Sequence, residues 1–137
     1  MYLLDTNICI YLINERSSRV LEKLVSLDPA EVAISSVTLA ELQYGVEKSE
    51  ARERNAKALD MFVVPMEVLP FDADAARAYG GVRADLERRG KPIGGMDLMI
   101  AAHALSARAT LVTNNTREFT RVRGLLVENW TRRDVST

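Results

Sequence analysis

The sequence of 137 residues contains a single cysteine, Cys9, and a single histidine, His103. One cysteine excludes an internal disulfide and fits a reducing compartment, and we interpret Cys9 as a small buried apolar residue. A zinc site is disfavoured because no cluster of cysteines and histidines exists, and we interpret His103 as structural. The chain also lacks a glycine-rich loop of the P-loop or dinucleotide-binding kind, so no nucleotide cofactor is implied.

Long hydrophobic runs are absent too. The longest apolar runs, Met61–Met66 and Leu98–Ala102, are far shorter than the ~20 residues that a membrane helix needs. The N-terminus begins directly with Tyr2-Leu3-Leu4 and has no basic leader. We therefore expect a cytoplasmic protein without a membrane segment.

Neither sign of charge dominates, since the net charge is −1. A nucleic-acid-binding protein of this balance must use a local basic patch rather than a global field. The hydrophobic content of 47% and the charged content of 27% are typical of a globular protein. Because no repeat, low-complexity tract or linker interrupts the chain, we predict one domain over residues 1–137.

What the chain contains is an alternation of short apolar strands with helical segments. The expected strands are Tyr2–Asp5, Glu31–Ser35, Val68–Pro70, Thr110–Thr113 and Leu125–Glu128. Strands that alternate with helices predict an α/β fold, with a central, mainly parallel sheet of four or five strands flanked by helices on both faces.

The expected helices begin at polar capping residues. The expected caps are Thr6 or Asn7 for the first helix, Ser17 and Ser18 for the second, Ser36 or Thr38 for the third, and Asp72 or Asp74 for a later one. Another helical region covers about residues 51–64. The helix from Asp97 to about Ala107 is apolar on nearly every face, which predicts a buried helix.

Four polar positions fall at or just beyond points where a strand gives way to a helix: Asp5, Glu41, Asp97 and Asn115. In a parallel sheet, the carboxyl ends of the strands lie along one edge. Carboxylates gathered there repel one another unless a cation lies between them. Mg²⁺ prefers one or two carboxylates together with water and substrate phosphate. The sequence therefore predicts a divalent-metal site and phosphate chemistry.

Each of these residues also has a purely structural interpretation. Asp5 and Asp97 are favoured types at a helix start, and Glu41 is compatible with a solvated face. The Asn114-Asn115 pair is ordinary turn chemistry, whereas Thr113 and Asn115 could also orient a metal-bound water or offer neutral oxygen ligands. The shared edge, rather than any one residue, supports the metal site.

Basic residues cluster at three places, namely Arg88, Arg89 and Lys91; Arg117, Arg121 and Arg123; and Arg132 and Arg133. Each cluster alone is typical of a solvated face. Two of them flank the proposed metal ligands, which is typical of an enzyme that acts on an anionic polymer.

Four segments in this order resemble the PIN-domain ribonucleases and, more narrowly, the VapC toxins of bacterial toxin–antitoxin pairs. They are Leu4–Asn7, Ile34–Gly45, Asp97–Ala104 and Thr113–Phe119. The resemblance extends from Tyr2 to Trp130. It implies an endoribonuclease dependent on Mg²⁺ or Mn²⁺ that inhibits translation, is silenced by a VapB-type antitoxin and forms a homodimer. Similar toxins cut the anticodon stem-loop of initiator tRNA, which makes a structured tRNA the leading candidate substrate.

The resemblance also implies roles for particular residues. Metal-binding acids of the family match Asp5, Glu41 and Asp97, and the fourth acid of many PIN domains falls on Asn115, with Glu118 three residues on. The residues expected to orient the carboxylates are Thr6, Asn7, Ser36 and Thr113. Those expected to hold RNA phosphates are Arg88, Arg89, Lys91 and Arg117.

Two other functions compete with this one. A phosphatase with an aspartyl nucleophile also places Asp after its first strand, but it needs a second Asp two residues later, where this chain has Asn7. A catalytically inactive PIN-like module that only binds RNA or protein is the main alternative. Retention of all three acids speaks against it, because a pure RNA binder gains nothing from negative charge facing RNA.

Overall fold

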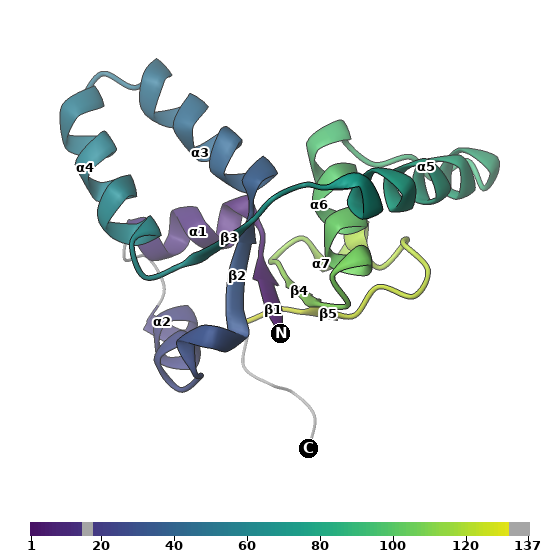
Figure 1. Cartoon of the computed structure of the whole chain (residues 1–137), viewed down its shortest axis with the longest axis horizontal. Helices are drawn as coiled ribbons and strands as arrows, with labels where there is room; N and C mark the ends of the chain where they lie inside the picture. The colour runs from purple at the N-terminus through teal and green to yellow at the C-terminus, as the bar shows by residue number, and fades with distance from the viewer. Residues whose placement is uncertain (15–17, 132–137) are drawn as a thin grey trace.

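The computed structural model describes residues 1–14 and 18–131. In these residues five strands form one sheet in the order β3-β2-β1-β4-β5, and every neighbouring pair is parallel (Figure 1). The strands are β1 Tyr2–Leu4, β2 Val32–Ser35, β3 Glu67–Leu69, β4 Thr110–Val112 and β5 Val127–Glu128. The prediction of an α/β fold with a mainly parallel sheet is confirmed.

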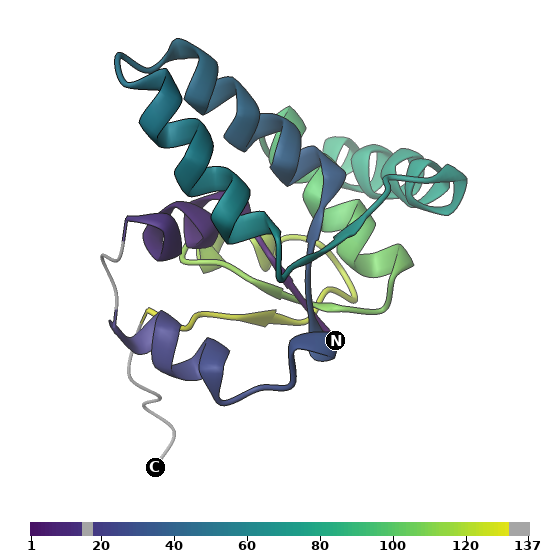
Figure 2. The same ribbon diagram turned by 60° about the vertical axis from the view of Figure 1, so that its left-hand side comes forward.

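Helices cover both faces of this sheet, as predicted (Figures 1 and 2). The helices are α1 Thr6–Ile13, α2 Ser18–Val25, η1 Pro29–Glu31, α3 Ser36–Lys48, α4 Arg52–Val63, α5 Ala73–Arg88, α6 Gly95–Ser106 and α7 Thr116–Phe119. The α3–α4 hairpin and α1 lie on one side, and α5, α6 and α7 lie on the other. The four-residue helix α7 was not predicted, because one turn shows no apolar periodicity.

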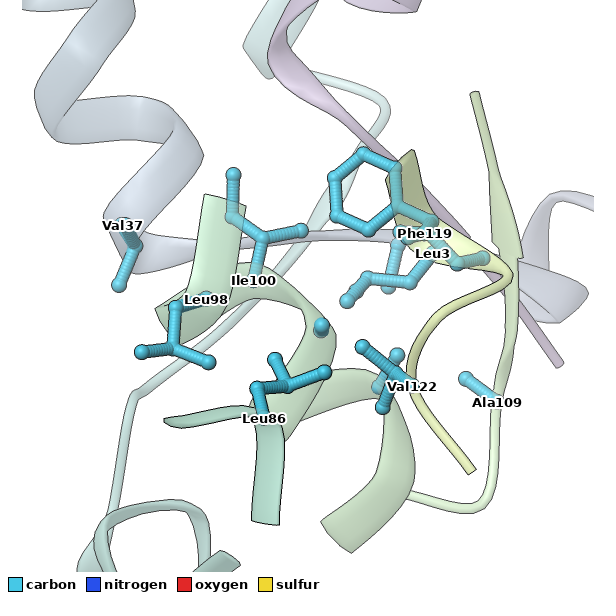
Figure 3. Packing of buried hydrophobic residues seen from close by; sticks show 12 residues of the cluster. Leu3, Val37, Leu86, Leu98, Ile100, Ala109, Phe119 and Val122 are labelled. Atoms are coloured by element: carbon cyan, nitrogen blue, oxygen red, sulfur yellow. The ribbon is translucent and has the colours of Figure 1, made fainter. Parts of the chain in front are cut away.

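Alternating strand residues build two separate cores. Leu3 and Leu111 pack with Ile100 of α6 and Phe119 of α7 (Figure 3). The next residue of β1, Leu4, lies in the other core with residues of α1 and α3. This alternation follows from the two-residue period of a strand, and it lets one short strand serve both layers.

Two helix caps lie one residue earlier than predicted. The side chain of Asp5 accepts a hydrogen bond from the backbone N–H of Ile8 at 2.9 Å, so Asp5 caps α1 in place of Thr6 or Asn7, in agreement with its structural interpretation as a residue of a helix start. Ser35 likewise caps α3 through the N–H of Val37 at 3.0 Å. The residue that ends each strand is still extended and can therefore serve as the cap. The cap of α5 is Asp72, as predicted, and Ser17 lies outside the described residues.

The helix that carries Asp97 begins two residues earlier than predicted, at Gly95, and half of its residues are buried. Cys9 is fully buried and His103 is 3% exposed, which confirms both structural interpretations. Nδ1 of His103 shares a hydrogen bond of 2.7 Å with Oγ of Ser35, and burial lowers the pKa of the imidazole. Within the described ranges, no helix has both the length and the apolar character required to cross a bilayer.

We predict that Phe119→Ala lowers the free energy of unfolding by about 3–5 kcal/mol, because it empties a site that is 1% exposed. Chemical denaturation monitored by circular dichroism measures this loss. Tyr44→Ala removes an aromatic ring that is 66% exposed and should cost less than about 0.5 kcal/mol. Equal losses in the two variants would contradict the anchoring role of Phe119.

Candidate active site at the carboxyl edge of the sheet

The sheet has a point at which its winding direction reverses. From the central strand β1 the chain proceeds outward to β2 and β3, whereas β4 and β5 lie on the opposite side of β1. In open parallel sheets, ligands bind beyond the carboxyl ends of the strands at such a point. Asp5 follows β1 and Thr113 follows β4, so both residues lie at the position where the fold favours a site.

Asp5 is a buried acid whose pKa is raised to about 6. Burial is the largest cause, because it disfavours the charged form, and the negative charge of Glu41 acts in the same direction. Hydrogen bonds from the hydroxyl of Thr113 and from the backbone of Ile8 and Asn7 act against this shift. The structure thus places Thr113 on the carboxylate, as predicted, while Asn7 contributes through its backbone.

Glu41 lies in the second turn of α3 and is held by the first residue of α1. The hydroxyl of Thr6 donates a hydrogen bond of 2.5 Å to Oε1 of Glu41, and it lies 3.4 Å from the hydroxyl of the buried Thr38. Because Thr6 directly follows Asp5, the same turn that positions one acid also orients the other.

Asp97 enters the site from the first turn of α6. Its pKa is raised to about 6, first by burial and then by the charges of Glu118, Asp5 and Glu41, in that order. Like charges raise a carboxyl pKa only when they lie close, so these four acids share one electrostatic environment. The site therefore contains Glu118 in addition to the three acids that the sequence indicated most strongly.

The side chains of Asn115 and Glu118 are bonded to each other. Nδ2 of Asn115 donates to Oε2 of Glu118 at 2.5 Å, and the backbone N–H of Gly94 donates to Oε1 at 3.1 Å. Both oxygens of Glu118 are therefore positioned, one by the residue that precedes α7 and one by the residue that precedes α6. Asn115 is also tied to the site through its N–H, which donates to the hydroxyl of Thr113 at 2.9 Å.

The hydroxyl of Ser36 has a different partner from the predicted one. It accepts a hydrogen bond of 3.0 Å from the N–H of Phe71 and so joins α3 to the segment before α5, rather than orienting a carboxylate. Sequence reasoning missed its neighbour Ser35, which caps α3 and also binds His103. The only available signal was its place at the end of an apolar strand.

The predicted RNA-binding residues differ in exposure and in partners. Arg88 is exposed at the end of α5, whereas Arg89 is half-buried and its guanidinium binds Asp85. Lys91 and Arg117 are exposed and line a common hollow. Arg132 and Arg133 lie outside the described residues.

The donor set at this edge suits a hard divalent cation. Its side chains offer carboxylate oxygens, the only cysteine is buried and the only histidine binds Ser35. In residues 1–14 and 18–131, no three acidic, cysteine or histidine side chains are arranged closely enough to enclose a metal by themselves. Mg²⁺ binding with few protein ligands, completed by water and phosphate oxygens, is compatible with that arrangement.

Comparison with known proteins identifies the family. The family model for the PIN domain matches residues 2–125. The chain is 47% identical over 131 residues to the ribonuclease VapC2 of Rickettsia felis, a match that covers 95% of this chain and 98% of that protein. It is 50% identical over 129 residues to the tRNA(fMet)-specific endonuclease VapC of Shigella flexneri, with 94% and 97% covered.

Solved structures agree with this assignment. The chain superposes on VapBC2 of Rickettsia felis bound to a promoter DNA fragment with a TM-score of 0.90 and 46% identity, covering 94% of this chain and 98% of that one. DNA-bound VapBC of Salmonella typhimurium also gives a TM-score of 0.90, at 45% identity with 94% and 97% covered. The fold, the acids at the carboxyl edge of the sheet and these comparisons therefore agree. The chain belongs to the PIN-domain family and, within it, to the VapC ribonucleases.

Proposed function

We propose that this chain is an endoribonuclease of the toxin type that hydrolyses phosphodiester bonds of RNA with Mg²⁺ or Mn²⁺ bound at the carboxyl edge. One observation carries the proposal: Asp5, Glu41, Asp97 and Glu118 come from four separate segments, yet their charges act on one another. Concentrated negative charge is unfavourable in a protein that approaches RNA unless a cation compensates it.

The proposed metal-site acids are Asp5, Asp97 and Glu41, and waters would complete the coordination that these three side chains do not enclose by themselves. Glu118 is proposed as the fourth acid in place of Asn115, because its charge acts on Asp97 while Asn115 donates to it. A divalent metal bound here supplies a water of lowered pKa and offsets charge on the phosphoryl oxygens. Glu41 either joins the ligands or accepts a hydrogen bond from the attacking water.

The surrounding hydrogen bonds prepare these acids for that role. The hydroxyl of Thr6 fixes one oxygen of Glu41, and the N–H of Ile8 fixes one oxygen of Asp5. Fixed carboxylates need less reordering when a metal and an RNA phosphate arrive, which is how such outer contacts support a metal site. The pKa values of Asp5 and Asp97 are raised to about 6, first by burial and then by neighbouring acids, so both carboxyls are mostly ionised at neutral pH and a bound cation would stabilise their charges.

The proposed substrate is tRNA, and the anticodon stem-loop of initiator tRNA is the leading site. The relatives from Shigella flexneri and Salmonella typhimurium are tRNA(fMet)-specific endonucleases. Single-stranded loops reach a recessed site more easily than a duplex does. Incubation of the protein with total tRNA and Mg²⁺, followed by mapping of the new 5′ ends, tests this choice. A single dominant end in one tRNA supports it, whereas cuts scattered over many tRNAs contradict it.

The proposed partner is a VapB-type antitoxin, since the similar solved structures are VapBC complexes. A hollow of about 360 Å³ opens between α1, α3 and α4, with Ile13 and Leu59 among its apolar lining, and it reaches Glu41. Tyr44 and Met61 on the α3–α4 hairpin are 66% and 77% exposed. Homodimerisation and a cytoplasmic location stay predictions from the sequence.

The inactive PIN-like module stays the competing function, and cleavage decides between them. We predict that Asp5→Asn and Asp97→Asn each lower the rate of tRNA cleavage by about 100-fold or more, the scale of a single charge-stabilising group. Asp60→Asn, a matched change at an exposed position of α4, should keep the parent rate. If EDTA and both site variants leave cleavage unchanged, the metal site is not where we place it.

We also predict that Asp97→Asn stabilises the metal-free protein at neutral pH. The folded pKa of Asp97 is about 6 against 3.8 in the unfolded chain, so ionisation of Asp97 destabilises the fold as pH rises between these values. Because Asp97 is partly exposed, solvent screening limits the gain to roughly 1 kcal/mol above pH 6. The gain should vanish near pH 4, and urea denaturation in EDTA measures it.

Addition of Mg²⁺ should reverse that order. At ten times its dissociation constant, Mg²⁺ adds about 1.4 kcal/mol to the parent protein by mass action, and much less to Asp97→Asn. Asp97 titrates between about pH 4 and pH 7.5. If Asp97→Asn stabilises the protein equally at these two pH values, the stability gain does not arise from ionisation of Asp97.

Thr6 provides a test of how Glu41 is positioned. We predict that Thr6→Val lowers cleavage or Mg²⁺ affinity by about 10–100-fold, because it removes the hydroxyl that binds Glu41 while keeping the shape of the side chain. Thr6→Ser keeps the hydroxyl and should restore most of the activity. If Thr6→Ser is impaired while Thr6→Val keeps the parent activity, packing of the Thr6 methyl group, and not its hydrogen bond, determines activity.

A further inference from the structure

A second feature lies beside the four acids: a basic hollow of about 430 Å³ between the loop that follows α5 and the segment that contains α7 and Arg121. Three of its five lining residues are basic and none is acidic. The lining residues are Gly90, Lys91, Pro92, Arg117 and Arg121. We call it the basic hollow.

The backbone around the basic hollow is built by the end of α5. Gly90 adopts the left-handed conformation (φ +66°), which a glycine tolerates without strain. The N–H of Gly90 then binds the carbonyl of Glu87 at 3.1 Å, and the N–H of Lys91 binds that of Leu86 at 2.9 Å. This helix-terminating arrangement turns the chain sharply, so that Lys91 follows directly on a fixed helix end.

Arg89 and Arg121 connect the two sides of the basic hollow. Nη2 of Arg89 binds both Asp85 and the carbonyl of Arg121, each at 2.6 Å. Nη1 of Arg121 in turn donates to the carbonyl of Pro92 at 3.1 Å. Arg89 is therefore a positioning residue within the protein, and the wall that carries Arg121 is tied to the loop that carries Lys91.

The cations of the basic hollow have no carboxylate partner among the described residues, in contrast to five arginines elsewhere in those residues. The arginines with an ion pair are Arg52, Arg77, Arg83, Arg89 and Arg123. Lys91, Arg117 and Arg121 form none within residues 1–14 and 18–131. Unpaired cations that converge on one hollow favour an anionic ligand.

The basic hollow adjoins the acids through two direct connections. Arg117 precedes Glu118 on α7, and Gly94, which closes the loop containing Lys91 and Pro92, donates its N–H to Glu118. We propose that the basic hollow is a subsite for a backbone phosphate of the RNA next to the one that is cut, with Lys91 and Arg117 as the contacting charges. This inference rests on the proposed function.

The chemistry of the lining selects a phosphodiester rather than a base. The hollow contains no aromatic side chain on which a base could stack, and its basic groups match phosphate oxygens. Contacts of this kind fix the register of a nucleic acid without reading its sequence. The basic hollow would therefore set which bond faces Glu118 and Asp97, and leave the choice of tRNA to other contacts.

Binding of labelled bulk tRNA to the Asp97→Asn protein tests the subsite without cleavage. We expect Lys91→Gln and Arg117→Gln each to weaken binding about fivefold near 0.1 M salt and to lower the slope of log affinity against log salt by about 0.7, as loss of one phosphate contact requires. Arg77→Gln, an equal change of charge on an exposed arginine of α5, should stay within about twofold of the parent.

Arg88→Gln decides whether the basic hollow or a diffuse basic face is involved. Arg88 lies close in sequence but outside the lining. Losses as large for Arg88→Gln as for Lys91→Gln, or parent-like binding by Arg117→Gln, would overturn the subsite. If the parent fails to cut RNA while Lys91→Gln and Arg117→Gln still weaken binding selectively, the proposed function fails and the subsite stands. If the parent cuts RNA and these two variants bind normally, the subsite fails and the proposed function stands.

Discussion

Burial of neighbouring carboxylates at the carboxyl edge of the sheet, with the repulsion among them, is the constraint on which the rest of this structure depends. Asp5 is nearly fully buried, and Asp97 is half-buried beside other acids, so both resist ionisation. Hydrogen bonds to Asp5 and Glu41 partly offset this cost, and both come from the first residues of α1, directly after β1. A cation relieves the remaining repulsion, which links stability of the folded chain to the chemistry proposed for it.

The sequence allowed prediction of the parts of this site that follow from strand position. Asp5 directly follows a buried strand, and a parallel sheet fixes where that strand ends, so its place at the edge was predictable. The caps could not be predicted to the residue, because Asp5 and Ser35 each end a strand and begin a helix at once. Local propensity does not distinguish such a residue from its neighbours.

The fourth acid shows a different limit. Asn115 and Glu118 were both open candidates, because they lie only three positions apart and the helix α7 that carries Glu118 has a single turn. Their hydrogen bond to each other, and the contact of Glu118 with Gly94, depend on how α7 packs against the loop before α6. Burial of Phe119 in the core fixes that packing, and this is a long-range contact that no local pattern reveals.

The roles of the basic residues also depend on long-range contacts and not on closeness in sequence. Arg88, Arg89 and Lys91 are close in sequence, yet one is exposed on a helix, one is paired with Asp85 and one lines the basic hollow. Arg117 comes from another part of the chain but lines the basic hollow together with Lys91, whereas Arg88 does not. Because α7 carries Arg117 and Glu118 side by side, a single turn of helix joins a group suited to hold RNA to a group suited to support its cleavage. Anchoring of that turn by Phe119 therefore connects the hydrophobic core to the alignment of the substrate.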